Sequence, residues 1–279
     1  MSEFAYTDRD FDRIRALIRQ RAGIALADGK RDMAYSRLAR LLRKAHLRSV
    51  SDYLDRLERQ GSSDDWQDFV NALTTNLTSF FRESHHFDML RELLRRKGAP
   101  TQQRIWCAGA STGEEAWTLA ITACEAFDGL QPPVEIIATD IDTACLQTAR
   151  RAVYPLTRIE GLSEARKRRY FQRGTGDNTG QVRVIPALQK LVRFAPSNLL
   201  DRQWPVQGPL DAIFCRNVMI YFDKATQRRL LERMAPMLRP EGLFFAGHSE
   251  SFFHAADVVR ACGRTVYAPV RSRHVGFAA

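Results

Sequence analysis

The stretch that decides the fold is Ile105-Trp106-Cys107-Ala108-Gly109-Ala110-Ser111-Thr112-Gly113-Glu114-Glu115. Residues 104–108 predict a buried strand, the two glycines a tight turn, and the run 114–127 an amphipathic helix. A second apolar run, 134–139, predicts a neighbouring strand that ends at Asp140. We expect glycines in this turn because a side chain would hold the backbone away from a ligand. An acidic residue at the second strand end suits hydrogen bonding to ribose hydroxyls, so the pattern indicates an α/β domain that binds a nucleoside.

The spacing of the turn narrows the class of ligand. Gly109 and Gly113 form Gly-x-x-x-Gly, which is neither the dinucleotide fingerprint Gly-x-Gly-x-x-Gly nor the phosphate loop. A nucleoside without a pyrophosphate, such as S-adenosylmethionine, fits this turn better, and a nicotinamide-dependent oxidoreductase is disfavoured. The alternative is that the glycines serve only the packing of the turn.

Composition and charge limit the possible partners. The chain has 279 residues, enough for one large domain or two small ones, and its 44% apolar content is typical of globular proteins. It has no apolar run long enough to span a membrane, and its five cysteines are widely spaced without a Cys-x-x-Cys pair. We therefore expect a cytoplasmic protein without a disulfide framework or a metal site. A net charge of +10 favours an anionic partner, which could be nucleic acid, a membrane surface or an acidic protein.

The first 75 residues predict helices, among them one at about 30–46 and another at about 51–60. The first of these carries a basic stripe at spacings of three, four and four residues: Arg37, Arg40, Lys44 and Arg48. No acidic residue is interleaved with these cations, which favours a docking surface for an acidic partner. The alternative is an ordinary solvated helix face.

A polar segment, 74–83, stands before the α/β domain and is too rich in Thr and Asn for the middle of a helix. Asn76, Thr78 and Arg82 offer donors that could reach a ligand from this linker, although the segment could also be a capped turn that begins a helix at 83–97.

After the second strand we expect further strands at 191–194, 210–215 and 243–247. We also expect a helix at 225–238 closed by a turn at 239–242, and a final strand at 265–270 pairing along an edge, followed by a frayed tail.

Residues 163–190 interrupt the alternation of strands and helices. Gly and Asn punctuate two short strand-like runs there, which predicts an inserted β hairpin or small antiparallel subdomain. An exposed edge of such a sheet could accept a peptide strand, or the insertion could be inert.

The segment after the strand 210–215 places Asn217 and Tyr221 near the reactive end of a bound cofactor, because ligands bind beyond the carboxyl ends of strands. Enzymes that methylate amino groups of nucleic acids have Asn-Pro-Pro-Tyr here, and this chain lacks the proline pair. No nucleophile–base system is evident. A carboxylate acceptor explains that, since a glutamate with a pKa of about 4.3 is already nucleophilic and needs alignment more than proton removal. Tyr221, Arg82 or Arg173 could orient it.

Five motifs together carry a family resemblance. The segments 74–83, 110–115, 138–142, 214–223 and 245–250 resemble, in this order and across nearly the whole chain, the chemotaxis receptor glutamate methyltransferases of the CheR family. The resemblance implies a class I S-adenosylmethionine-dependent methyltransferase, with a Rossmann-like, mostly parallel sheet and a small antiparallel β insertion at about 163–190. It also implies a helical N-terminal domain at 1–75, a linker and helix at 76–103 that contribute to the cofactor site, and a catalytic domain at 104–279.

The implied activity is the esterification of glutamates on cytoplasmic helices of chemoreceptors, which releases S-adenosylhomocysteine and adapts the chemotactic response. Asp140 would bind the ribose, Asn198 and Leu199 would lie by the adenine, and Arg82 and Tyr221 would act in catalysis. The implied cofactor contacts are Asn76, Thr78, Arg82, Gly109, Glu115, Asp140, Asn198, Leu199, Arg216 and Asn217.

The resemblance also assigns substrate contacts. The basic helix, with Arg37, Arg40, Lys44 and Arg48, would dock on acidic receptor helices. Arg173, Gly174 and Gly176 of the insertion would approach the substrate or hold a C-terminal receptor peptide as a tether. We expect a monomer. The alternatives are a non-catalytic S-adenosylmethionine-sensing adaptor and a nucleic-acid methyltransferase, which the basic charge favours and the missing proline pair opposes.

Overall fold

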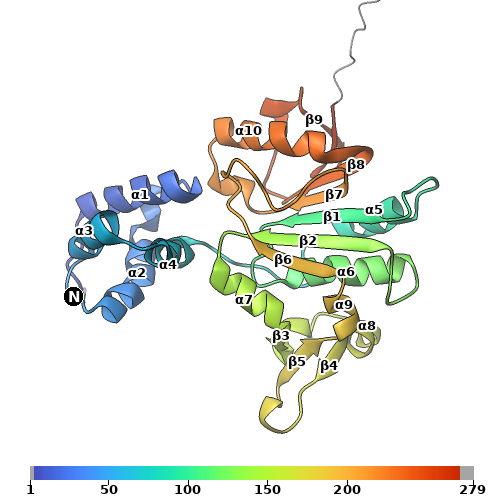
Figure 1. Ribbon diagram of the computed structural model, residues 1–279, viewed down its shortest axis with the longest axis horizontal. Coiled ribbons are helices and arrows are strands. Elements are labelled where there is room, and N and C mark those ends of the chain that lie inside the picture. The colour runs from blue at the N-terminus through green and yellow to red at the C-terminus, as the bar shows by residue number, and fades with distance from the viewer. Residues whose placement is uncertain (1–2, 271–279) are drawn as a thin grey trace, which may run out of the picture.

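The computed structural model describes residues 3–270, and the N-terminal part of this range folds into a group of helices (Figure 1). These are α1 (Asp8–Ala22), η1 (Asp28–Lys30), α2 (Arg31–Ala45), α3 (Val50–Gln60) and α4 (Ser63–Leu73). Thr7, Ser49 and Ser62 cap α1, α3 and α4, each accepting a hydrogen bond from a backbone N–H that the first turn leaves free. The apolar faces of the helices meet in one core around Ile14 and Leu38, both fully buried.

A seven-stranded sheet forms the centre of the described residues, in the order β6-β2-β1-β7-β8-β10-β9 (Figure 1). The strands are β1 (Gln103–Ala108), β2 (Val134–Asp140), β6 (Val192–Pro196), β7 (Leu210–Cys215), β8 (Leu238–Ala246), β9 (Val259–Gly263) and β10 (Val266–Pro269). The first five in the spatial order run parallel, and β10 and β9 are antiparallel. The chain moves outward from β1 to β6 and then returns to β7 on the other side of β1. Ligands bind at such a reversal of strand order.

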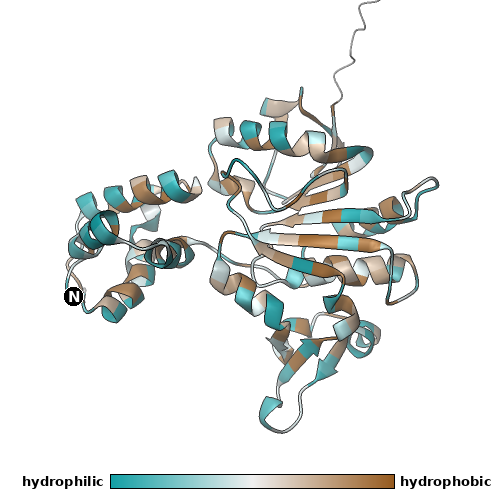
Figure 2. Cartoon of the chain, viewed as in Figure 1, coloured by the Kyte–Doolittle hydropathy of each residue, from teal (hydrophilic) through white to brown (hydrophobic). Residues whose placement is uncertain are grey.

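Both faces of the sheet are buried, as expected for parallel strands, and Figure 2 shows the strands as largely hydrophobic. Alternate residues of β1 enter two separate cores: Ile105 and Cys107 enter one, Trp106 and Ala108 the other. The first core is covered by α5 (His85–Arg95) and α6 (Glu114–Ala126), and the second by α10 (Lys224–Met234). A further helix, α7 (Thr143–Arg151), packs beside β2 and β6. The predicted fold class is confirmed.

A small antiparallel sheet in the order β3-β5-β4 projects from the domain. Its strands are β3 (Val153–Pro155), β4 (Phe171–Arg173) and β5 (Gln181–Val184), accompanied by η2 (Leu156–Ile159), α8 (Glu164–Tyr170), η3 (Gly176–Asn178) and α9 (Pro186–Gln189). The predicted hairpin corresponds to β4 and β5. The sheet starts earlier than the predicted insertion because β3 pairs with β5, and residues 164–170 are helical.

Two details of the C-terminal part differ from expectation. The predicted turn 239–242 lies inside β8, as an irregularity: Leu210 pairs with Leu238, whereas Ala212 pairs with Leu243. The helix before it therefore ends at Met234 and is followed by η5 (Ala235–Met237). The last strand, β10, is not at the edge, because the unpredicted strand β9 pairs with its outer side.

None of the helices within residues 3–270 combines the length and the apolar character needed to cross a bilayer. The tail predicted after Pro269 lies, apart from Val270, outside the described residues.

Candidate functional site

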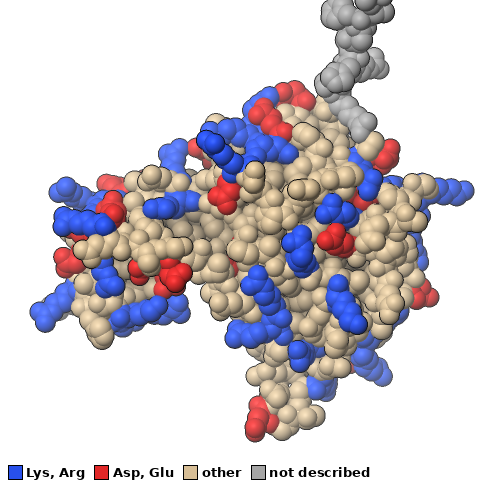
Figure 3. Space-filling view, in the orientation of Figure 1, with Lys and Arg blue, Asp and Glu red and all other residues tan. Residues whose placement is uncertain are grey.

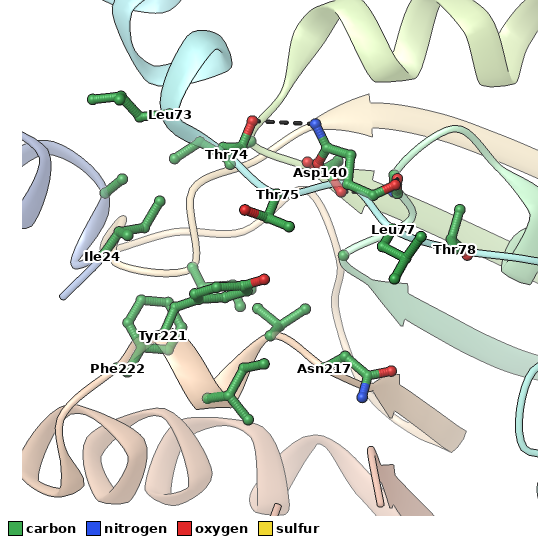
Figure 4. A pocket seen from close by; sticks show the side chains of 18 of the residues that line it. Ile24, Leu73, Thr74, Thr75, Leu77, Thr78, Asp140, Asn217, Tyr221 and Phe222 are labelled. Atoms are coloured by element: carbon green, nitrogen blue, oxygen red, sulfur yellow. Dashed lines mark hydrogen bonds between the residues drawn. The ribbon is translucent and has the colours of Figure 1, made fainter. Parts of the chain in front are cut away.

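A cavity of about 400 Å³ lies at the carboxyl ends of β1, β2 and β7, between the sheet and the helical N-terminal part (Figure 4). Its lining residues come from the segment after α1 (22–33), the linker (73–78, with Arg82), the strand ends (109–115 and 139–141) and the loops 197–199 and 216–222. Figure 4 shows Tyr221 and Phe222 beside Ile24, facing Thr75 and Asp140 across the space. The cavity is therefore placed at the reversal of strand order.

Asp140 is a buried carboxylate in the wall of this cavity. Its Oδ2 accepts the backbone N–H of Ser111 (2.7 Å) and its Oδ1 that of Asp142 (2.8 Å). Burial raises the pKa of Asp140 to about 6, against the lowering effect of these hydrogen bonds. A carboxylate held this firmly, with lone pairs left over, can accept hydrogen bonds from hydroxyl groups of a ligand.

The glycines of the turn after β1 are required mainly by its backbone conformation and by neighbouring side chains of the protein. Gly109 and Gly113 have φ values of 102° and 99°, a region that L side chains rarely adopt. A Cβ on Gly109 would lie 2.4 Å from Cγ2 of Val218, and one on Gly113 would lie 2.8 Å from Cβ of Ala149. Gly109 lines the cavity and Gly113 does not. The expectation that both glycines make room for a ligand is therefore wrong for Gly113, which is required by close packing of α7.

A buried cluster of charges stands beside the turn. The side chain of Arg216 is fully buried, and its guanidinium contacts Glu115 (2.7 Å) and Glu83 (3.3 Å). Burial raises the pKa of Glu115, although Arg216 counteracts it. Burial also acts to raise the pKa of Glu83, but Arg216 and His248 outweigh it and the net change is a lowering. The two carboxyls differ in the balance of these effects: at Glu115 burial outweighs the lowering by Arg216 and by the hydrogen bond from the Cys107 thiol, whereas at Glu83 the contacts with Arg216 and His248 outweigh burial.

Arg82 is held in place by unusual backbone on both sides. Phe81 and Glu83 have φ values of 54° and 58°, although neither is a glycine. The Arg82 guanidinium donates to the carbonyl oxygen of Leu77 (2.9 Å), and its own carbonyl oxygen accepts from Arg216. Strained residues persist where the surrounding structure fixes them and often mark functional sites. Ser111 and Asn217, which also line the cavity, have positive φ values as well.

The loop after β7 brings Asn217 and Tyr221 to the cavity, as expected from the strand order. Its shape depends on Glu250, a buried carboxylate that accepts the backbone N–H groups of Asn217 (3.0 Å) and Ile220 (3.2 Å). Burial raises the pKa of Glu250, opposed by these hydrogen bonds. The chain also comes close at Gly247, where a Cβ would lie 2.3 Å from Nδ2 of Asn217. The sequence analysis included Glu250 in the motif 245–250 but assigned it no role. The feature that could have pointed to it is an acidic residue shortly after an apolar strand.

The remaining predicted cofactor residues also line the cavity: Asn76, Thr78, Asn198 and Leu199. Asn76 donates to Oδ2 of Asp142 (2.7 Å), and Asn198 donates to the carbonyl oxygen of Arg21 (2.7 Å) at the end of α1. The second contact shows what the sequence analysis missed. The segment after α1 closes one side of the cavity, with lining residues Ala22, Ile24, Ala25, Leu26, Ala27, Lys30 and Met33.

The predicted basic stripe is only partly continuous. Arg48 lies beyond α2, which ends at Ala45 in a left-handed cap at His46. Lys44 is paired with Asp68 of α4 (2.9 Å), so an acidic neighbour comes from another helix. Arg37 is half-buried and donates to the linker at Thr74 and Thr75. Within the described residues, Arg40 is exposed and forms no hydrogen bond or salt bridge.

The insertion residues lie away from the cavity. Arg173 is exposed at the end of β4 and does not line it, so the structure does not bring Arg173 to Arg82 and Tyr221. Gly174 is required by its own loop, since a Cβ there would lie 2.1 Å from the carbonyl oxygen of Asn178. Gly176 has a φ of 57°.

The donor set of the cavity fits S-adenosylmethionine. Two buried polar atoms of lining residues have no hydrogen-bond partner among the described residues, Nε of Arg216 and Oγ of Ser197. A ligand with a carboxylate, hydroxyl groups and ring nitrogens can satisfy such atoms, while Leu199, Ile141 and Val218 offer apolar surface for a ring. Nowhere in residues 3–270 do three or more His, Cys, Asp or Glu side chains gather as metal ligands would.

Comparisons with known proteins agree with this geometry. Residues 9–74 match the model of the CheR methyltransferase all-alpha domain, and residues 76–268 that of the CheR methyltransferase SAM-binding domain. Chemotaxis protein methyltransferase 2 of Pseudomonas aeruginosa is 54% identical over 96% of this chain and 95% of its own length. The chemotaxis protein methyltransferases of Salmonella typhimurium and Escherichia coli are 51% and 49% identical, each over 95% of this chain and over 91% and 92% of their own lengths.

Proposed function

The chain belongs to the CheR methyltransferase family and is an S-adenosylmethionine-dependent methyltransferase of chemotaxis, and we propose that it methylates the side-chain carboxylates of glutamates on the cytoplasmic helices of chemoreceptors. The products are glutamate methyl esters and S-adenosylhomocysteine. The observation that carries the proposal is that Asp140, Arg82, Asn217 and Tyr221 line one cavity at the reversal of strand order, with no nucleophile–base pair among the lining residues.

The residues that would hold the cofactor are those of the cavity wall: Asn76, Thr78, Gly109, Glu115, Asp140, Asn198, Leu199, Arg216 and Asn217. When bound, S-adenosylmethionine supplies a methyl group on a positively charged sulfur. Asp140 accepts hydrogen bonds through a carboxylate already fixed by Ser111 and Asp142.

Arg82 and Tyr221 orient the acceptor. The guanidinium of Arg82 is anchored to the Leu77 carbonyl oxygen and keeps further N–H groups for a carboxylate. A glutamate carboxylate is ionised at neutral pH, so the site needs no base and contributes by alignment. An anchored arginine is suited to this because it fixes both oxygens of a carboxylate at once.

The partner surfaces belong to the same proposal. On α2 the exposed Arg40, with Lys44 nearby, presents positive charge to acidic receptor helices, and Arg48 extends this charge past the helix end. Figure 3 shows Lys and Arg spread over the helical part together with acidic side chains. In the small sheet, β4 is an edge strand that ends at Arg173, and Gly174 and Gly176 lie in the loop that leads to β5. A C-terminal receptor peptide can add to that edge as a strand. If the folded protein with its small sheet intact binds no receptor tail peptide, this part of the proposal is wrong.

The test is a methylation assay with methyl-labelled S-adenosylmethionine and receptor-containing membranes. Mild base releases methanol from carboxyl esters, so volatile counts measure the proposed product. We expect Arg82→Ala to lose roughly a hundredfold or more of the activity, because positioning groups are worth several kcal/mol in the transition state. Arg260→Ala is the matched control, since Arg260 is exposed on the edge strand β9. S-adenosylhomocysteine binding, measured for each variant, separates lost catalysis from lost cofactor.

Other outcomes favour the alternatives. Cofactor binding without base-labile counts would favour a sensing adaptor. Counts that are stable to base and appear on RNA would favour a nucleic-acid methyltransferase, which the net charge of +10 makes worth testing.

A further inference from the structure

The inference concerns Arg37, whose side chain leaves α2 and reaches the linker. The guanidinium donates to the carbonyl oxygen of Thr74 and to Oγ1 of Thr75 (3.4 Å). Thr74 is the C-cap of α4, so this carbonyl belongs to the first residue after the last helix of the N-terminal part. The side chain is half-buried and makes no salt bridge among the described residues. A charge that is neutralised only by backbone oxygen is well placed to fix that backbone.

The segment that Arg37 holds is a wall of the cofactor cavity. All five residues of 74–78 line the cavity, and Arg82 follows them. The far side of this segment is attached to the sheet, because Asn76 donates to Oδ2 of Asp142 (2.7 Å) and its carbonyl oxygen accepts from Oγ of Ser111 (3.1 Å). The linker is therefore held between α2 and the end of β2, and Arg37 is the side-chain contact on the α2 side.

A second connection joins α2 to the same cavity. The helix is entered directly from η1, and the segment 22–33 that contains η1 lines the same cavity as the linker. That segment is bonded to the catalytic part, where the backbone N–H of Ala25 donates to the carbonyl oxygen of Tyr221 (2.9 Å). One end of α2 thus continues into one wall of the cavity, and Arg37 near its middle holds another.

We propose that Arg37 is a positioning residue of the cofactor site, which holds the linker 74–78 against α2 in the conformation that binds S-adenosylmethionine. Through the same contact, α2 joins its exposed face, the proposed receptor-docking face, to the wall of the cofactor cavity. This proposal depends on the cofactor and not on the identity of the methyl acceptor. It separates Arg37 from Arg40, although both are arginines on one helix three residues apart.

The test is titration of the purified full chain with S-adenosylhomocysteine, without receptor, by calorimetry. We expect Arg37→Ala to weaken binding roughly fivefold to tenfold, since hydrogen bonds from a charged donor are lost. Arg37→Lys keeps the charge and N–H donors on a single nitrogen, without the planar fork of the guanidinium, and should recover part of the affinity. Arg40→Ala removes the same charge from an exposed site and should stay within twofold of the unchanged protein. Equal weakening in Arg37→Ala and Arg40→Ala would mean a general charge effect and would overturn the proposal.

Amide hydrogen exchange gives a readout that stability alone does not move. We expect faster exchange at residues 75–78 in Arg37→Ala and in Arg37→Lys to a lesser degree, with exchange of the α1 core unchanged. Should Arg37→Ala fail to fold, Arg37→Lys still decides the matter through its linker exchange and its affinity. Unchanged exchange and unchanged affinity in a folded Arg37 variant would leave the proposal without support and refute it.

Discussion

Charged side chains meet in two contrasting settings, the cavity edge of the sheet and the surface of the helical part. At the cavity, Arg216 is fully buried between Glu115 and Glu83. On the helical part, Lys44 and Asp68 form a pair of similar length, 2.9 Å, but the Lys44 side chain is largely exposed and that of Asp68 is partly exposed. Buried pairs are costly to break because one partner is left as an unpaired charge, whereas exposed pairs exchange readily with water and other partners. The contrast suits the two proposed roles, a rigid cofactor site at the cavity and an adaptable docking surface on the helical part.

The largest effect is expected from breaking the buried cluster. Arg216→Met leaves two carboxylates without their common partner, and we expect the free energy of unfolding to fall by about 3–5 kcal/mol. Urea unfolding of the full chain measures the change. A loss below about 1 kcal/mol would show that Glu83 and Glu115 find other partners or become protonated, and would remove the contrast.

The pH dependence of cofactor binding tests whether the buried carboxylate Asp140 acts in its ionised form. Its pKa is raised to about 6, so the carboxylate is lost as the pH falls through 6. We expect the affinity for S-adenosylhomocysteine to fall about tenfold between pH 7.5 and pH 5, because roughly one Asp140 carboxyl in ten stays ionised one pH unit below its pKa. Calorimetric titrations at several pH values measure it, with Asp140→Asn as a control that should bind weakly at every pH.

The sign for stability is the opposite. The pKa of Asp140 is about 6 in the folded chain and near 3.9 in an unfolded one, so protonation favours the folded state. This carboxyl alone makes the fold more stable as the pH falls from above 6 towards 4. An affinity for S-adenosylhomocysteine that stays constant between pH 7.5 and pH 5 would contradict the proposal that the Asp140 carboxylate binds the ligand.

A smaller effect is expected on the docking surface. Arg40→Ala should raise the KM for receptor roughly twofold to fivefold, with kcat and cofactor affinity unchanged, because exposed ion pairs contribute little each. Initial rates over a range of receptor concentrations measure it, and the difference from the unchanged protein should shrink at high salt. An equal loss at 0.5 M salt would argue for a structural role of Arg40.

The smallest effect is expected from the exposed pair itself. Lys44→Met should leave the urea unfolding midpoint unchanged within error, since the Lys44 side chain is largely exposed and Asp68 remains accessible to water. It carries the same substitution type as Arg216→Met and so isolates the effect of burial. A shift comparable to that of Arg216→Met would mean that burial does not separate the two settings.

The parts of the site that lie on single strands were the parts that the sequence could predict. β1 and β2 were visible as apolar runs. Asp140 is the last residue of its strand, and Asn217 and Tyr221 follow the end of theirs, so the rule for parallel sheets places them together. The insertion was visible through its Gly and Asn residues, although its first strand was not, because β3 has only three residues and gains its partner from a distant β5. The edge position of β9 was missed for the same reason, since its pairing with β10 leaves no local pattern in an exposed strand.

What the sequence by itself determined is the α/β class, the family and most of the residues proposed to hold the cofactor, because these depend on local periodicity and on motifs contiguous in the chain. The tertiary structure alone decided that the segment after α1 closes the cavity, that Arg216 joins Glu115 to Glu83, and that Arg37 holds the linker. Each of these joins residues far apart in the chain. Whether an arginine contacts solvent, a carboxylate or a backbone carbonyl depends on what folding places beside it, and neither its own helix nor its spacing carries that information.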